Sequence, residues 1–493
     1  MQSNTDAVEP SQQTLETKAP GSLPRQFWGL AATEVWERFS FYGLQAVLSF
    51  YLFYAVTGGG LGMSQSTAVG IVGAYGAFVY VMQFAGGWLG DRLIAPRVLV
   101  LAGAVTIMIG HVALAAIPGV AGLAAGLIAI AIGTGALKTN ISVIVGHLLP
   151  SDPARRDAGF SYFLMAINTG GLLGPIATGW MQSVKGFHAA FVIAAVGMAV
   201  GLIQYLAGYS RLPAKSAIVA NPVRGAGLIV PVAASAGVAL LAVGLIVSGA
   251  IPPGALTYLA GGFILVCAAL LFGVVLRSPA STDADRRRVR GFIPLWIAAV
   301  LYYGILQQIF TTMAIFITDR VNLQVLDWEV PAAWLIASAS LFGVTLTPVV
   351  TRMWAAGRFS RFGAATKITV GLVLVSVAYL LLLLSEFSPG KTVSPLLVLE
   401  TMAIAGVSEV FVNPVTLSLA TRIAPRNFQS QLTALGVLVI GGGAALSGML
   451  GILFTQISTL TYLILVGVGG LLIAAALHTF APRIHRLVVG DAG

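Results

Sequence analysis

The chain has 493 residues, of which 57% are hydrophobic and 9% are charged, and its mean hydropathy is +0.92. Soluble domains carry about 25% charged residues, so this composition excludes an ordinary water-soluble protein. The formal net charge of +10 is compatible with nucleic-acid binding, but the position of the charges along the chain argues against it.

Apolar runs recur along the whole chain, and each is long enough to cross a hydrocarbon core of roughly 30 Å as a helix. Short segments of alternating hydrophobicity, which are typical of a membrane barrel, do not appear in the sequence. We therefore predict an all-α membrane protein with fourteen transmembrane helices, at residues 27–55, 66–90, 98–118, 121–149, 159–182, 187–209, 225–249, 255–276, 291–318, 331–356, 364–386, 394–421, 428–455 and 459–480.

The N-terminal residues and the single cysteine restrict the chain further. Residues 1–24 are polar and lack the basic start and apolar stretch of a signal peptide, so we predict a disordered cytoplasmic tail. Cys267 is the single cysteine and lies in an apolar run. It excludes a disulfide within the chain and a metal site built on several thiolates, and we interpret it as a small buried hydrophobic residue.

The loops between the predicted spans fall into two alternating sets with very different charge. One set contains most of the arginines, including the run at residues 286–290, whereas the other contains only Lys185, Arg320 and Lys391. This asymmetry predicts a multi-pass protein of the cytoplasmic (inner) membrane, with the basic loops and both termini in the cytoplasm. The excess of basic residues then reflects the membrane topology of the chain. We expect these residues to contact anionic lipid, and we expect no nucleic-acid partner.

The longest cytoplasmic connections, near residues 210–224 and 277–290, divide the spans into groups of six, two and six. We predict an N-terminal six-helix bundle at 25–210 and an inserted helical hairpin with its linkers at 211–290. A C-terminal six-helix bundle follows at 291–482, and a cytoplasmic tail at 483–493. The apolar hairpin is expected to face lipid. Two six-helix halves are typical of transporters that hold the substrate between the halves near the membrane midplane.

Ionisable residues inside the spans are the strongest functional signal, because each costs about 2.5–3.5 kcal/mol at the bilayer centre on insertion scales. Glu34, Glu37 and Arg38 lie in the first span at spacings that place them on one helical face. Arg38 can neutralise one carboxylate, and Lys138 in the fourth span is a natural partner for the other. Glu409 lies in the predicted span 394–421.

A buried carboxylate beside a lysine is suited to proton coupling. Burial disfavours the charged form of the carboxylate and the nearby cation favours it, so small changes of geometry can load or release a proton. The sequence does not decide whether Glu34 or Glu37 binds the proton.

Five segments, taken in order, resemble one family. EVWERFSFYG (34–43) is similar to the ExxERFxYYG motif of the proton-dependent oligopeptide transporters (POT/PTR) of the major facilitator superfamily. GAYGAFVYVMQFAGGWLGDR (73–92), GALKTNIS (135–142), RRDAGFSYFLMAINTGGLLGP (155–175) and SEVFVNPVTLSLATRIAP (408–425) resemble later motifs of that family, and the two added helices resemble its bacterial members. The resemblance implies two six-helix bundles plus an inserted two-helix hairpin, driven by a proton gradient without a cofactor.

The resemblance also implies roles for individual residues. Glu34, Glu37, Arg38 and Lys138 would form the proton-coupling cluster, and Arg38 and Lys138 would bind the carboxylate of a peptide. Glu409 would bind the peptide amino group. A cationic and an anionic end about one dipeptide apart suit a zwitterion.

Other residues carried over by the resemblance surround these charges. Tyr42, Tyr80 and Asn168 would line the substrate pocket, although an asparagine can simply bond between helices and a tyrosine can simply pack. Asp91 and Arg92 resemble the superfamily's cytoplasmic loop motif, and we interpret them as a conformational latch.

The chain departs from the family pattern inside these motifs. The departures are Phe41 for a tyrosine, Gln45 for an arginine, Gln307 for an acidic residue, Ala339 and Ser340 for Asn-Pro, and Leu438 for a tryptophan. Phe41, Gln45 and Leu438 are therefore candidate substrate contacts that differ from those of the family. Gln307 belongs to the predicted substrate site, and together with Gln308 it can act as a neutral hydrogen-bonding gate.

The leading hypothesis is a monomeric symporter that imports di- and tripeptides with protons by alternating access. The alternative keeps the fold and changes the cargo to another organic anion, a modified peptide or a drug-like molecule, including in an exporter. A membrane-embedded enzyme is disfavoured because the five histidines are dispersed and form no HExxH pair. The chain also lacks a GxxxxGK[ST] loop for ATP, and its polar residues cluster in a few helices instead of lining a continuous channel.

Overall fold

The computed structural model describes residues 23–150, 152–223, 251–355 and 363–489, and almost all regular structure in these ranges is helical. The α-helices are α1 (Arg25–Phe53), α2 (Gln65–Arg92), α3 (Pro96–Ala116), α4 (Gly119–Leu148), α5 (Pro153–Lys185), α6 (Phe187–Gly208), α8 (Leu256–Arg277), α9 (Asp283–Leu306), α10 (Thr312–Arg320), α11 (Ala332–Ala355), α12 (Ala364–Leu381), α13 (Pro395–Ile423), α14 (Gln429–Phe454) and α15 (Thr459–Val489). Strands β1 (Gln324–Val325) and β2 (Trp328–Glu329) form a short antiparallel hairpin between α10 and α11.

Twelve helical segments of the described chain are long and apolar enough to cross a membrane. They coincide with twelve of the fourteen predicted spans. Helix α1, which corresponds to the first predicted span, carries Glu34, Glu37 and Arg38 and is not among the twelve. The predicted span 225–249 lies outside the described residues, so the count of fourteen stays a prediction.

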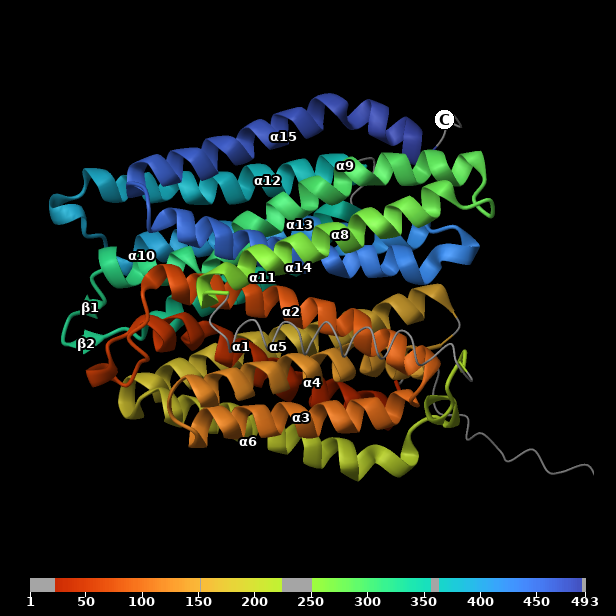
Figure 1. Ribbon diagram of the computed structural model, residues 1–493, viewed down its shortest axis with the longest axis horizontal. Coiled ribbons are helices and arrows are strands. Elements are labelled where there is room, and N and C mark those ends of the chain that lie inside the picture. Colours follow the sequence, from red (N-terminus) through yellow and green to blue (C-terminus); the bar gives the residue numbers. More distant parts are fainter. Residues whose placement is uncertain (1–22, 151, 224–250, 356–362, 490–493) are drawn as a thin grey trace, which may run out of the picture.

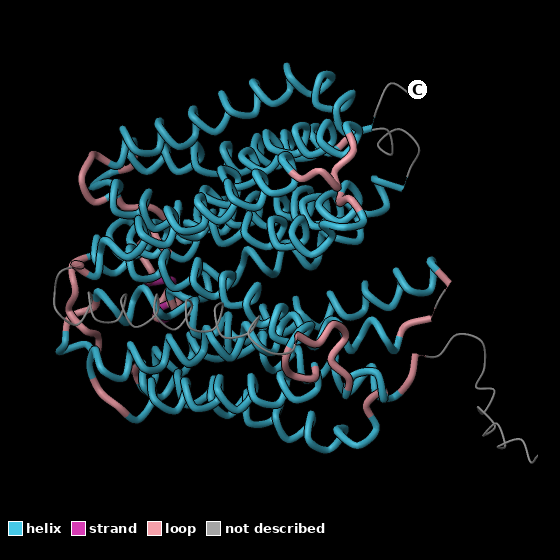
Figure 2. Tube along the Cα trace, turned by 45° about the vertical axis from the view of Figure 1, so that its right-hand side comes forward, coloured by secondary structure: helices cyan, strands magenta, loops and turns pink. Residues whose placement is uncertain are grey.

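The helices run side by side between two ends of the molecule, and the loops gather at these ends (Figure 2). Helices α1 to α6 form one group, and α9 to α15 form a second group on the other side of the molecule (Figure 1). Helix α8 packs against α2 of the first group and α14 of the second. The hydroxyl of Thr257 on α8 donates a hydrogen bond of 2.7 Å to the carbonyl of Ala445 on α14. The prediction that the hairpin faces lipid therefore misses this packed face of α8.

Glycines allow the closest helix contacts within the first group. A side-chain carbon at Gly86 on α2 would collide with the backbone of Gly135 on α4, and one at Gly170 or Gly174 would collide with α1. The GxxxG spacings Gly86–Gly90 and Gly170–Gly174 therefore mark close helix packing. The contact between α1 and α5 fixes the rotation of α1 and directs its charged face into the bundle.

The predicted span 291–318 differs from the structure at its start and in its middle, each time for a local reason. Helix α9 begins at Asp283 instead of residue 291, because Thr282 and Asp285 form a capping box that starts the helix inside the charged linker. The predicted span 291–318 is also interrupted by a 3-10 turn, η6 (Gln307–Phe310), between α9 and α10.

Candidate functional site

The charged residues of α1 form a compact buried cluster with Lys138 of α4. Glu34 and Glu37 are fully buried, and Arg38 is 4% exposed. The Nε of Arg38 donates to Oε2 of Glu37 at 2.5 Å, and its Nη2 donates to Oε1 at 2.7 Å. Lys138 forms an ion pair with Glu34, whose Oε1 lies 3.6 Å from Nε of Arg38. The expected pairing of Lys138 with the second carboxylate is therefore confirmed.

The two carboxylates have unequal surroundings. Both oxygens of Glu37 accept hydrogen bonds from Arg38, and Oε1 also accepts one from the Thr134 hydroxyl at 3.4 Å. The Oε2 atom of Glu34 is buried and has no hydrogen-bond partner in the part of the chain that the structure describes. A buried carboxylate oxygen without a hydrogen-bond partner is costly, which distinguishes Glu34 from Glu37.

Aromatic rings cover the guanidinium of Arg38. Its Cζ lies 4.8 Å from the ring centroid of Phe41 and 5.8 Å from that of Tyr42. The rings of Phe41 and Tyr75 on α2 are 6.5 Å apart. Phe41 thus departs from the family pattern and packs on the charged cluster, where it shields Arg38 without supplying a hydroxyl.

Glu409 on α13 lies on the other side of the site. Its side chain is exposed, and its Oε1 accepts a hydrogen bond of 3.4 Å from Nδ2 of Asn413. Its charge also interacts electrostatically with four tyrosine hydroxyls, which belong to Tyr42, Tyr80, Tyr302 and Tyr303. Tyr42 and Tyr80 come from α1 and α2, so the carboxylate of Glu409 acts electrostatically on residues of the first helix group.

Tyr302 and Tyr303 on α9 are site residues that sequence reasoning did not identify. Both are buried, and the hydroxyl of Tyr302 lies 2.9 Å from Oγ of Ser408, next to Glu409. The tyrosine doublet shortly before the departure at Gln307 is the signal that could have indicated them.

Asn168 on α5 lies three helical turns before Gly179 and therefore on the same helix face. Gly179 packs against Ala333 and Trp334 of α11, so this face of α5 is directed toward the second helix group. The amide of Asn168 makes no hydrogen bond within the described residues.

The interruption between α9 and α10 is held by polar contacts. Gln308 is buried, and its Oε1 accepts a hydrogen bond of 2.5 Å from the hydroxyl of Tyr462 on α15. The carbonyl of Phe310 accepts a hydrogen bond from Ser49 of α1, which belongs to the first helix group. Residues 307–310 contain no Pro or Gly. Side chains satisfy the backbone carbonyls that the break frees: Nε2 of Gln308 donates to the carbonyl of Gly304, and Ser49 donates to that of Phe310.

The other departures differ in their surroundings. Gln45 and Leu438 are buried at 5% and 2% exposure, and the Oε1 atom of Gln45 has no hydrogen-bond partner among the described residues. Gln307 is half-buried at the start of η6. Ala339 is buried and Ser340 is half-buried on α11.

The predicted latch residues lie apart from the charged cluster. Asp91 and Arg92 are exposed at the end of α2. Their carbonyls accept hydrogen bonds from the backbone of Asn221 and Val223, in the segment after α6.

Comparison with known proteins reveals close similarity over nearly the whole chain. The sequence profile of the POT family matches residues 97–466. A di-/tripeptide transporter of Lactococcus lactis subsp. cremoris is 31% identical over 483 residues, covering 95% of this chain and 97% of the relative.

Solved structures give the same result. A crystal structure of a mutant form of the peptide transporter POT in complex with alafosfalin has a TM-score of 0.88 and 34% identity, covering 94% of this chain and 96% of that one. A POT family transporter in complex with 5-aminolevulinic acid has a TM-score of 0.87 and 30% identity, covering 94% and 97%.

Proposed function

Because this chain belongs to the POT family, we propose that it is a proton-coupled symporter that imports di- and tripeptides by alternating access. The observation that carries the proposal is the buried cluster of two carboxylates and two cations opposite Glu409. Buried ionisable groups in transmembrane helices are typical of proton and substrate pathways. We further propose that Asp91 and Arg92 act as a conformational latch at the end of α2.

The charge distribution of the site matches a zwitterionic peptide. Arg38 and Lys138 can bind the terminal carboxylate, and the exposed carboxylate of Glu409 can bind the terminal amino group. Charge-assisted hydrogen bonds of this kind are about twice as strong as neutral ones. Asn168, Tyr42, Tyr80 and Gln307 then line the space between the two charged ends.

We assign the coupled proton to Glu34. Its Oε2 is buried and unpaired in the described part of the chain, whereas Glu37 is engaged by Arg38 and Thr134. The cluster of Glu34, Glu37, Arg38 and Lys138 is neutral when all four groups are charged. A proton on Glu34 gives it one positive charge and releases Lys138, which favours the arrival of a peptide carboxylate. Proton binding and peptide binding thereby support each other.

The contacts between the helix groups indicate a conformation that is closed at one end. Nε2 of Gln65 donates to Asp319 at 3.2 Å, and Nε1 of Trp334 donates to the carbonyl of Ile176 at 2.9 Å. These residues lie at the end opposite the basic loops. Met165 lies three turns before Ile176 on the same face of α5 and is 52% exposed. We propose that the structure is an inward-facing state, closed at the end opposite the basic loops and open at the end where these loops lie.

The architecture that accompanies this function has two six-helix bundles and an inserted hairpin, with boundaries at residues 25–210, 211–290 and 291–482. We propose a monomer in the cytoplasmic membrane with both termini inside, since the basic loops all belong to one side.

A second candidate is transport of another organic anion, a modified peptide or a drug-like molecule through the same fold. It is favoured by Gln45 and Gln307, which replace charged residues of the family pattern. The related structures with alafosfalin and 5-aminolevulinic acid show that relatives bind such molecules.

Counterflow in proteoliposomes separates the two candidates. Vesicles are loaded with dialanine, and the exchange of labelled dialanine is competed with trialanine, alafosfalin and 5-aminolevulinic acid. Peptide transport predicts that dialanine exchanges and that trialanine competes. The second candidate predicts that dialanine does not exchange, and that labelled alafosfalin or 5-aminolevulinic acid exchanges instead.

A further inference from the structure

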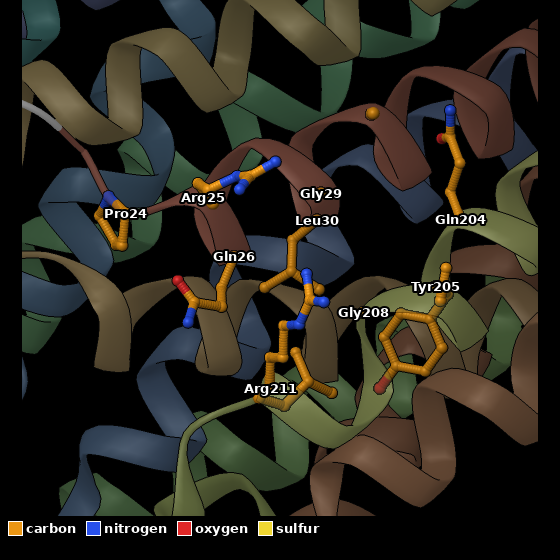
Figure 3. A pocket seen from close by; sticks show the side chains of 12 residues that line it. Pro24, Arg25, Gln26, Gly29, Leu30, Gln204, Tyr205, Gly208 and Arg211 are labelled. Atoms are coloured by element: carbon orange, nitrogen blue, oxygen red, sulfur yellow. The ribbon is translucent and has the colours of Figure 1, made fainter.

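A cavity of about 760 Å³ lies between the start of α1 and the end of α6, apart from the charged cluster (Figure 3). Arg211 is the last residue of η2 (Tyr209–Arg211), the 3-10 turn that follows α6, and its side chain extends toward α1, whereas Gln204 and Tyr205 lie on the last turns of α6 (Figure 3).

The cavity is built to attract an anion. It is lined by Arg25 and Arg211, and no acidic residue is among its described lining. Both arginines are exposed, and neither forms an ion pair with another described residue. Arg25 and Gln26 of the first turn of α1 line the cavity, and this turn has no side-chain cap, so its free backbone N–H groups add to the positive potential there.

An exposed apolar stripe on α6 leads to the cavity. Val192, Val196, Ile203 and Leu206 are 48–65% exposed, and their spacing places them on one helix face. Ala207, the next residue, lines the cavity. A basic cavity at the end of an apolar stripe matches a molecule that joins an anionic head to hydrocarbon chains.

We propose that this cavity binds the phosphate of an anionic phospholipid from the cytoplasmic leaflet, with the acyl chains along the α6 stripe. Arg25 binds the phosphate from the start of α1, and Arg211 binds it from η2, the turn that follows α6. Basic recesses between helices on the cytoplasmic side are suited to such headgroups. The site is separate from the peptide site, so it does not depend on the transported substrate.

Native mass spectrometry of the full-length protein with phosphatidylglycerol tests this proposal, with phosphatidylcholine as the zwitterionic comparison. The double variant Arg25→Gln/Arg211→Gln removes both cavity charges. The double variant Arg483→Gln/Arg486→Gln is the matched control, because it removes two exposed arginines from α15. Size-exclusion chromatography and dialanine counterflow verify that each variant is folded.

We expect the wild-type protein and the control variant to bind phosphatidylglycerol more tightly than phosphatidylcholine. The cavity variant should bind phosphatidylglycerol about 10- to 30-fold more weakly, since each basic residue near an anionic surface contributes about fivefold. Equal binding by the cavity variant and wild type would overturn the proposal, as would an equal loss in the control. Displacement by soluble glycerol phosphate at the concentration of the lipid would show that the cavity binds free phosphate instead.

One further outcome would show that a segment of the chain itself, and not a lipid, occupies the cavity. If phosphatidylglycerol binds only after Asp6, Glu9 and Glu16 are changed to Asn, Gln and Gln, the acidic N-terminal segment competes for the arginines. Lipid binding by the unmodified chain is the result that the proposal predicts.

Discussion

Lys138 of α4 forms an ion pair with Glu34 of α1, and this contact joins the two cations and two carboxylates of the site into one neutral cluster. Removing one partner of a buried pair leaves an uncompensated charge and costs about 3–5 kcal/mol. A proton or a peptide carboxylate can provide the missing compensation. The cluster therefore links charge balance to the binding of both transported species.

The Glu34→Gln variant tests the assignment of the proton. Glutamine has the shape of a protonated glutamic acid, so the variant should bind peptide but should not couple it to protons. We expect exchange of dialanine in counterflow, and no accumulation above equilibrium when a proton gradient is applied. Accumulation at the wild-type level would contradict the role of Glu34.

Glu37→Gln is the matched control for this variant. Glu37 holds Arg38 through two hydrogen bonds, so its loss should impair the positioning of Arg38 and weaken peptide binding. We expect a higher KM in counterflow with residual accumulation. If Glu37→Gln abolishes accumulation while Glu34→Gln retains it, the proton belongs to Glu37.

The Lys138→Ala variant should lose both uptake and its dependence on pH. It leaves Glu34 without its closest cation and removes a group that binds the peptide carboxylate. A buried charge left without its partner costs about 3–5 kcal/mol, which corresponds to a loss of about two orders of magnitude or more in the population of the binding-competent state. Initial rates of uptake between about pH 5.5 and 8 provide the measurement, and a pH profile like that of wild type would refute this role.

The Glu409→Gln variant should discriminate between peptides with and without a free amino group. Loss of a charge-assisted hydrogen bond of about 1.5–3 kcal/mol raises the KM for dialanine roughly 10- to 100-fold. N-acetyl-dialanine lacks the ammonium group and should compete more weakly than dialanine. Its affinity should be the same for the wild-type protein and for the variant, because it has no group that Glu409 can bind. An equal effect on both peptides would show that Glu409 does not bind the amino end.

Cysteine accessibility tests the inward-facing state, because the chain has a single cysteine, Cys267. In a Cys267→Ala background, Met165→Cys should react with a membrane-impermeant maleimide in inside-out vesicles and remain protected in right-side-out vesicles. Ser49→Cys is the control at the closed end, where Ser49 is 1% exposed and bonds to Phe310. Labelling of Met165→Cys only from the outside would contradict this assignment.

The contact between Gln308 and Tyr462 should stabilise the break between α9 and α10. Tyr462→Phe removes the hydroxyl and leaves Oε1 of Gln308 unpaired, so we expect a loss of about 1–3 kcal/mol in the free energy of unfolding. The half-buried Gln307 gives the matched pair of variants: Gln307→Glu should be tolerated, whereas Gln308→Glu should lower the melting temperature. Thermal unfolding in detergent measures both differences, and equal melting temperatures would contradict the proposed contact.

Most of the helical architecture was predictable because long apolar runs determine transmembrane helices almost independently of tertiary context. The pairing of Lys138 with an α1 carboxylate was also predictable, because few ionisable residues lie inside the spans and their charges must be compensated. The early start of α9 depends on a capping box in a charged linker that hydropathy alone does not identify.

Other features required the tertiary structure. The break at residues 307–310 lacks Pro and Gly and depends on partners from α1 and α15. The stacking of Phe41 on Arg38 and the electrostatic interaction of Glu409 with Tyr42 and Tyr80 depend on how separate helices are rotated. The arrangement of Arg25 and Arg211 around one cavity likewise follows from helix packing, because the two arginines lie far apart in the sequence.

Accumulation of labelled dialanine by proteoliposomes, with and without an inward proton gradient, tests peptide–proton symport most directly. We predict concentrative uptake that requires the gradient and collapses when a protonophore is added. Uptake that only equilibrates under the gradient, or no uptake by folded protein that exchanges another anion, would contradict this function.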